Sequence, residues 1–165
     1  MKRALISAVL VAAGALALTG VGTVSAAGEN GAGTGDRVTM NLIGHETAVA
    51  QLDLGTPGPS LGDEVVFSGQ LLNPDGDQVG HFEGTLTAVT PEANSQSLAV
   101  VVLGLRGGQI TVQGELNFAT QTDFVHAITG GTGAYRDAGG EFSFRDTAQR
   151  GVIDITLQID RRRPG

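Results

Sequence analysis

The sequence predicts an all-β domain, a closed antiparallel barrel, from three observations. Glycine accounts for 26 of the 165 residues, and Val, Thr, Ile and Leu are frequent, which favours twisted strands and tight turns. From Arg37 onward, apolar and polar residues alternate in short runs, as half-buried strands require. Glycine- and proline-containing turns separate these runs, and no convincing helical pattern follows the N-terminal segment. Many short strands joined in this way are typical of a closed barrel.

The first 36 residues are expected to lie outside this domain. Met1-Lys2-Arg3 and the apolar run from Ala4 to Gly20 resemble a secretory signal, with small residues for cleavage after Ala26. We therefore divide the chain into a signal peptide (1–26), a flexible leader (27–36), the barrel (37–160) and a basic tail (161–165). This division predicts a secreted, extracellular protein without a stable membrane anchor.

About eight or nine alternating runs follow in order. The first places Val38, Met40 and Leu42 on one side, and the breaker from Gly55 to Pro59 ends the second. Asn73-Pro74-Asp75-Gly76-Asp77 has the composition of a hairpin turn, so the runs that flank it are expected to pair antiparallel. The later runs are Ala48 to Leu54, Glu64 to Leu72, Gln78 to Val89, Ser97 to Leu103, Gln109 to Leu116, Phe124 to Thr129, Glu141 to Asp146 and Gly151 to Ile159.

Four segments resemble, in order and spacing, the allene oxide cyclases. They are Leu61 to Phe67, Val79-Gly80, Ile110 to Gly114 and Ala127 to Gly133. The run from Gly130 to Arg136 also resembles the signature of plant dirigent proteins. This resemblance implies an eight-stranded barrel, commonly a homodimer or homotrimer, whose lumen holds an apolar small molecule or a reactive intermediate. It also implies cyclisation or coupling of that molecule without a cofactor.

Alternation along the strands then predicts which side chains face the lumen. Phe82 and Leu86 lie on the apolar face of one strand, and Phe67 and Gly69 on that of its partner. The plant cyclase has a pocket Asn and a pocket Cys where this chain has Gly69 and Leu86. The residues expected to bind ligand are Met40, Phe67, Gly69, Phe82, Leu86, Tyr135 and Phe142.

Two charged residues are candidates for catalysis. If Val38, Met40 and Leu42 point inward, Glu46 does so too, and a carboxyl group against apolar walls can act as general acid or base. The alternative is a solvated loop glutamate. Arg136 matches a pocket-edge Arg of the dirigent proteins, where it would hold a carboxylate or an oxyanion. The alternative is a surface Arg paired with a neighbouring carboxylate.

The three histidines receive other interpretations. His81 alternates opposite to Phe82 and is expected on the outer face, and His126 is expected to be structural. No two histidines have metal-ligand spacing, so we expect no metal site. The glycine run after Ile128 lacks the Lys-Ser/Thr ending of a phosphate loop.

Charge excludes one further class of partner. The formal net charge is −7 and becomes about −9 without Lys2 and Arg3, so nucleic acid would be repelled. Two functions remain. The first is a cyclase-like or dirigent-like protein that orients a reactive intermediate in its lumen. The second is a non-catalytic barrel that carries a small hydrophobic ligand.

Overall fold

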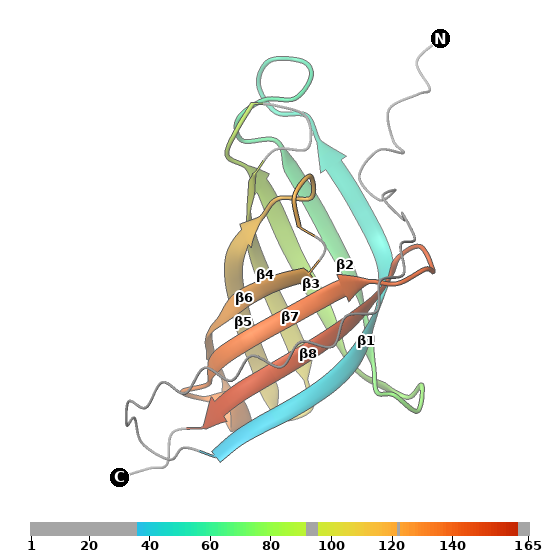
Figure 1. Cartoon of the computed structure of the whole chain (residues 1–165), viewed down its shortest axis with the longest axis vertical. Helices are drawn as coiled ribbons and strands as arrows, with labels where there is room; N and C mark the ends of the chain where they lie inside the picture. Colours follow the sequence, from blue (N-terminus) through green and yellow to red (C-terminus); the bar gives the residue numbers. More distant parts are fainter. Residues whose placement is uncertain (1–35, 92–95, 122, 162–165) are drawn as a thin grey trace, which may run out of the picture.

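The computed structural model describes residues 36–91, 96–121 and 123–161, which form a closed eight-stranded antiparallel barrel (Figure 1). Each strand pairs with the next along the chain, and the last strand pairs with the first. The predicted barrel is thereby confirmed. The strands are β1 (Asp36–Leu52), β2 (Glu64–Leu72), β3 (Gln78–Ala88), β4 (Ser97–Leu105), β5 (Gly108–Leu116), β6 (Asp123–Gly131), β7 (Gly139–Asp146) and β8 (Val152–Arg161).

The proposed signal peptide, most of the leader and the last four residues of the basic tail lie outside the described residues. The described barrel begins at Asp36 and ends at Arg161. Within the described part of the chain, no helix is long and apolar enough to cross a membrane.

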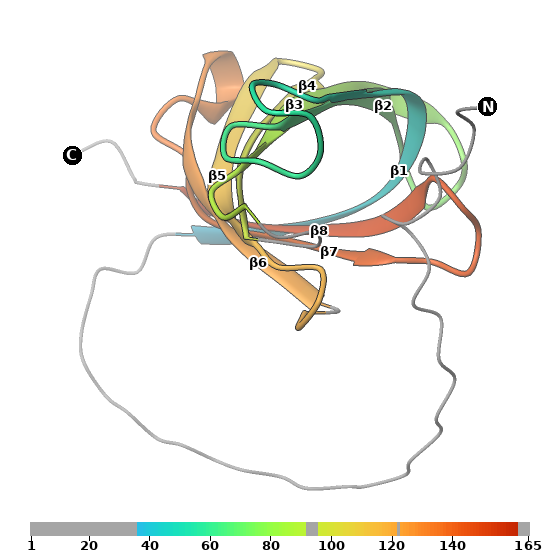
Figure 2. The ribbon, with the colours of Figure 1, turned by 90° about the horizontal axis from the view of Figure 1, so that it is seen from above.

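The prediction of two separate runs at the start of the barrel is wrong, because they form the single long strand β1. Its first part, Asp36 to His45, pairs with β8, and Ile43 to Leu52 pairs with β2. A bulge at Thr47 keeps the strand continuous, and the Thr47 hydroxyl donates to the Ser68 carbonyl oxygen at 3.2 Å. One strand thus bridges two neighbours and closes the barrel, as the view from above shows (Figure 2).

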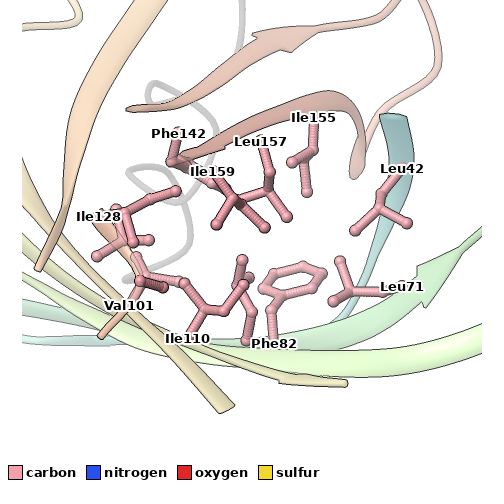
Figure 3. Packing of buried hydrophobic residues seen from close by; sticks show 13 residues of the cluster. Leu42, Leu71, Phe82, Val101, Ile110, Ile128, Phe142, Ile155, Leu157 and Ile159 are labelled. Carbon is pink, nitrogen blue, oxygen red and sulfur yellow. The ribbon is translucent and has the colours of Figure 1, made fainter. Parts of the chain in front are cut away.

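Apolar side chains from opposite walls meet inside the barrel (Figure 3). Leu71 and Leu103 on one side and Leu157 on the other are fully buried, as the alternation of each strand requires. This main cluster fills the half of the barrel that contains the start of β1 and the end of β8. Burial of these side chains supplies the packing energy of a domain that has no cysteine and therefore no disulfide.

The same end of the barrel is covered by the short 3-10 helix η1 (Gly133–Tyr135), between β6 and β7. Tyr135 packs against the main cluster, and its hydroxyl lies 3.5 Å from the Arg106 carbonyl oxygen. Gly133 adopts a φ of +60°, and a Cβ there would lie only 2.1 Å from the Gly107 carbonyl oxygen. The glycine run therefore serves a tight turn packed against the β4–β5 hairpin.

Candidate functional site

The half of the barrel opposite η1 holds a cavity of about 450 Å³. It opens to solvent near the end of β1, because exposed residues of this strand (Glu46, Val49 and Gln51), of the end of β7 (Asp146) and of the β7–β8 turn (Arg150) belong to its wall. Five of the six phenylalanines line it: Phe67 of β2, Phe82 of β3, Phe118 of the β5–β6 connection, and Phe142 and Phe144 of β7. Most of the other lining residues are aliphatic.

Five of the residues proposed from the sequence lie in this lining: Glu46, Phe67, Phe82, Leu86 and Phe142. They come from β1, β2, β3 and β7, and each occupies the inward phase of its strand. The structure therefore brings them to one cavity. Their roles in binding and catalysis remain predictions.

Gly69 and Met40 face inward but do not line the cavity. Gly69 pairs with Phe82, whose ring covers it so closely that a Cβ at Gly69 would be 2.4 Å from the ring. Met40 lies opposite Leu157 and packs against the main cluster, in the filled half of the barrel. A larger residue at position 69 would thus displace Phe82 before it reached the lumen.

Arg136 and Tyr135 lie at the other end of the barrel from Glu46. Arg136 follows η1 and borders a separate surface depression together with Asp137 and Asp160. The structure does not bring Arg136 to Glu46, because the β6–β7 connection and the end of β1 are at opposite rims. The position of Arg136 supports the surface alternative, although no ion pair is formed by its side chain within the described residues.

The open rim carries three charged side chains that line the cavity: Glu46, Asp146 and Arg150. Burial raises the pKa of Glu46, and the negative charge of Asp146 raises it further, while Arg150 opposes the shift. Burial also raises the pKa of Asp146. The Glu46 backbone N–H donates to the Gly151 carbonyl oxygen at 2.8 Å, which holds the glutamate against the β7–β8 turn. This rim can exchange protons with a bound molecule.

His126 is the functional candidate that sequence reasoning missed. Its side chain is 3% exposed and belongs to the cavity wall, on the inward face of β6 between Phe124 and Ile128. The signal was present, because the inward phase of Phe124 and Ile128 places His126 on the same face. Burial lowers the pKa of His126, so the ring is neutral at neutral pH.

His81 is exposed on the outer face, and its Nε2 lies 3.9 Å from a carboxylate oxygen of Glu83. Among the residues that the structure describes, no cluster of three His, Cys, Asp or Glu side chains could hold a metal ion.

Comparison with known proteins identifies relatives of this barrel. A pyocyanin demethylase is 32% identical, with a TM-score of 0.62, over 73% of this chain and 99% of that chain. The pterocarpan synthase dirigent protein GePTS1 is 17% identical, with a TM-score of 0.63, over 76% of this chain and 88% of that chain. The Diels-Alderase AbmU from Streptomyces koyangensis is 16% identical, with a TM-score of 0.61, over 74% of this chain and 63% of that chain. The last two similarities show the fold alone.

A comparison with the curated proteins gave no match. The family model of the allene oxide cyclase barrel like domain, however, matches residues 43–158, from the middle of β1 to near the end of β8. The matched region contains β2 to β7 in full, parts of β1 and β8, and every residue of the cavity wall. This chain therefore belongs to the family of allene oxide cyclase barrel like domains.

Proposed function

We propose that this protein binds a small, largely apolar molecule in its lumen and steers the cyclisation or coupling of that molecule without a cofactor. One observation carries the proposal: an apolar cavity of about 450 Å³ is closed at one end and charged at its open rim. That size and that combination are typical of small-molecule sites. The Diels-Alderases and dirigent proteins of the same fold support a reaction of this kind.

The proposed mechanism relies on orientation. The phenylalanine-rich wall excludes water and restricts the conformations of a flexible or reactive intermediate, which lowers the entropic part of the barrier. At the rim, the raised pKa of Glu46 suits a group that donates a proton to the substrate or accepts one from it. Arg150 supplies a positive charge beside that carboxyl group.

Mass spectrometry of small molecules retained after native purification tests this proposal. A Leu86→Trp variant should lose the retained molecule, because an indole at this inward position fills the cavity. Thr85→Trp is the matched control, since Thr85 lies one residue away and does not line the cavity. Circular dichroism must show that both variants fold, because overpacking is destabilising. Unchanged retention by a folded Leu86→Trp variant would exclude the lumen as the binding site.

Turnover then separates catalysis from simple transport. A cyclase-like protein should lose turnover in Glu46→Gln while still binding product. If the retained molecule is released unchanged by the wild-type protein under all conditions, the barrel is a carrier.

A second candidate reaction is demethylation of a small molecule. It is favoured by the 32% identity with a pyocyanin demethylase that this chain covers almost completely. Incubation with pyocyanin, followed by mass spectrometry, would detect the loss of a methyl group. An unchanged pyocyanin mass would leave the cyclisation or coupling proposal as the one to pursue.

A further inference from the structure

The cavity ends inside the barrel, because buried side chains close it on the side of η1. Five buried residues line the cavity and also belong to the main cluster, and we call them the floor: Phe82, Val101, Leu103, Phe142 and Ile155. Leu71 and Leu157 belong to the main cluster but not to the cavity wall, and they are fully buried behind the floor. A molecule that enters at the open rim can therefore reach the floor and no further.

Phe82 has a glycine on three sides within the barrel wall. Gly80 and Gly84 flank it on the inward face of β3, and Gly69 lies opposite it on β2. The ring extends over Gly69, because a Cβ there would collide with Cε1 and Cζ at the outer end of the ring. None of the three glycines has a side chain that could take the place of the ring. A single side chain thus closes the floor along this part of the wall.

The residue behind this part of the floor is Leu71. It lies two residues beyond Gly69 on the same inward face of β2 and is fully buried. Figure 3 shows the Phe82 ring beside Leu71, facing Ile155 and Leu157 on the opposite wall. Without the ring, the space over Gly69 would connect the cavity with Leu71.

We propose that Phe82 is a specificity-determining residue: its ring sets the depth of the lumen, so that the barrel takes compact apolar molecules and does not accommodate extended alkyl chains. This inference rests on the proposed lumen function and names the shape class of the ligand. Glu46, Asp146 and Arg150 keep the open rim polar, so the apolar part of a ligand gains affinity only between that rim and Phe82. A longer chain leaves its additional methylenes in water at the rim.

A homologous series of linear alcohols, from 1-pentanol to 1-dodecanol, tests the proposal by isothermal titration calorimetry. For the wild-type protein, the affinity should rise about fourfold per methylene, the increment typical of burial, and level off at the chain length that reaches Phe82. In Phe82→Ala the rise should continue to longer chains. This variant should then bind 1-dodecanol roughly tenfold more tightly than the wild-type protein does, as burial of two further methylenes would give.

Phe118→Ala is the matched control. Phe118 also lines the cavity, but it follows β5 at the open end and packs against the second cluster of Ala99, Leu116 and Phe124. Its truncation removes the same atoms near the rim, so the affinity should level off at the wild-type chain length. Phe82→Leu leaves a smaller void than Phe82→Ala and should shift the levelling point in the same direction, which keeps the test decisive if the alanine variant fails to fold. Circular dichroism checks the fold of each variant.

A measurement on the wild-type protein does not depend on the folding of any variant. Nuclear Overhauser contacts from the chain of bound 1-dodecanol should reach the methyl groups of Leu86 in the cavity wall, and none should reach those of Leu71 behind the floor. Contacts to Leu71 in the wild-type protein would show that the chain passes Phe82, and they would overturn the proposal.

Two results of the titrations would also overturn it and leave lumen binding intact: the same levelling point in the wild-type protein and in folded Phe82→Leu, or a rise that continues to 1-dodecanol in the wild-type protein. If the wild-type protein binds none of the alcohols while a retained natural molecule is found, depth does not select the ligand and the inference fails. If no small molecule binds at all, the proposed function fails as well.

Discussion

The imidazole of His126 lies directly over Gly114 on the neighbouring strand, where a Cβ would approach Cδ2 to 2.2 Å. Phe82 covers Gly69 of its neighbouring strand in the same way. In both pairs, a glycine leaves the space in which an aromatic ring of the lumen packs against the backbone. The positions of two rings that shape the cavity thus depend on residues without side chains.

Gly114→Ala should push the His126 ring out of place. The added methyl group meets the ring at a distance that no relaxed structure tolerates, so we expect a loss of about 1–3 kcal/mol in the free energy of unfolding. Urea denaturation measures it. Gly139→Ala is the matched control, because a Cβ at Gly139 has no neighbour within 4 Å. A Gly114→Ala variant as stable as this control would show that the ring moves aside freely.

The free energy of unfolding should fall below neutral pH in part because of His126. Burial lowers the pKa of this histidine in the folded state, so the unfolded chain binds its proton first as the pH drops. As the pH falls, this loss of unfolding free energy begins near the unfolded pKa of about 6.5. It grows by at most about 1.4 kcal/mol per pH unit until the folded pKa is reached.

His126→Phe removes this contribution, and its stability should therefore change less between about pH 7.5 and pH 5.5 than that of the wild-type protein. His45 and His81 are present in both proteins and cancel in the comparison. Parallel pH profiles of the two proteins in urea denaturation would contradict the prediction.

Glu46→Gln should slightly stabilise the barrel at neutral pH. The folded pKa of Glu46 is raised, so the ionised form is less favourable in the folded state than in the unfolded chain. This cost is present at high pH and disappears as the pH falls through the folded pKa to below the unfolded value. The gain should stay below about 1 kcal/mol, because Glu46 is exposed at the rim and solvent screens its charge. Thermal unfolding of both proteins checks that the variant is more stable at neutral pH and that this difference disappears at acidic pH.

The outer face of β4 and β6 should mediate association into a homodimer or homotrimer. Leu98, Val100 and Val125 are 53%, 45% and 60% exposed on these strands. Such apolar side chains on one surface favour contact with a second copy of the chain. Light scattering should give an oligomer for the wild-type protein and a smaller species for Val100→Lys. Val66→Lys, which changes an exposed valine of β2, should leave the oligomer intact. A strictly monomeric wild-type protein at micromolar concentration would refute the prediction.

Export is proposed from residues 1–26. The mature protein should begin at or near Ala27 and be recovered outside the cytoplasm. N-terminal sequencing of secreted material tests this expectation. A protein that retains Met1 in the membrane fraction would contradict it.

The sequence by itself determined the fold class and the inward face of most strands. Phe67, Phe82 and Leu86 line the lumen as their period-two alternation predicts, because successive side chains of a strand point to opposite sides. The same rule could have placed His126 inside, on the face of β6 that also carries Phe124 and Ile128. Alternation failed beyond Glu46, where the bulge at Thr47 changes the phase and turns Val49 and Gln51 inward.

Only the tertiary structure decided which inward residues share a cavity. Alternation assigns a side chain to the inside of the barrel but says nothing of its height along the axis. That height depends on how the strands pair and where the barrel closes. Closure through the long strand β1 puts Glu46 at the open rim, while Arg136 follows η1 at the opposite end. Cross-strand contacts likewise decided that Phe82 covers Gly69, because the register of the β2–β3 hairpin, which sets the residues that lie opposite one another, has no signature in either strand alone.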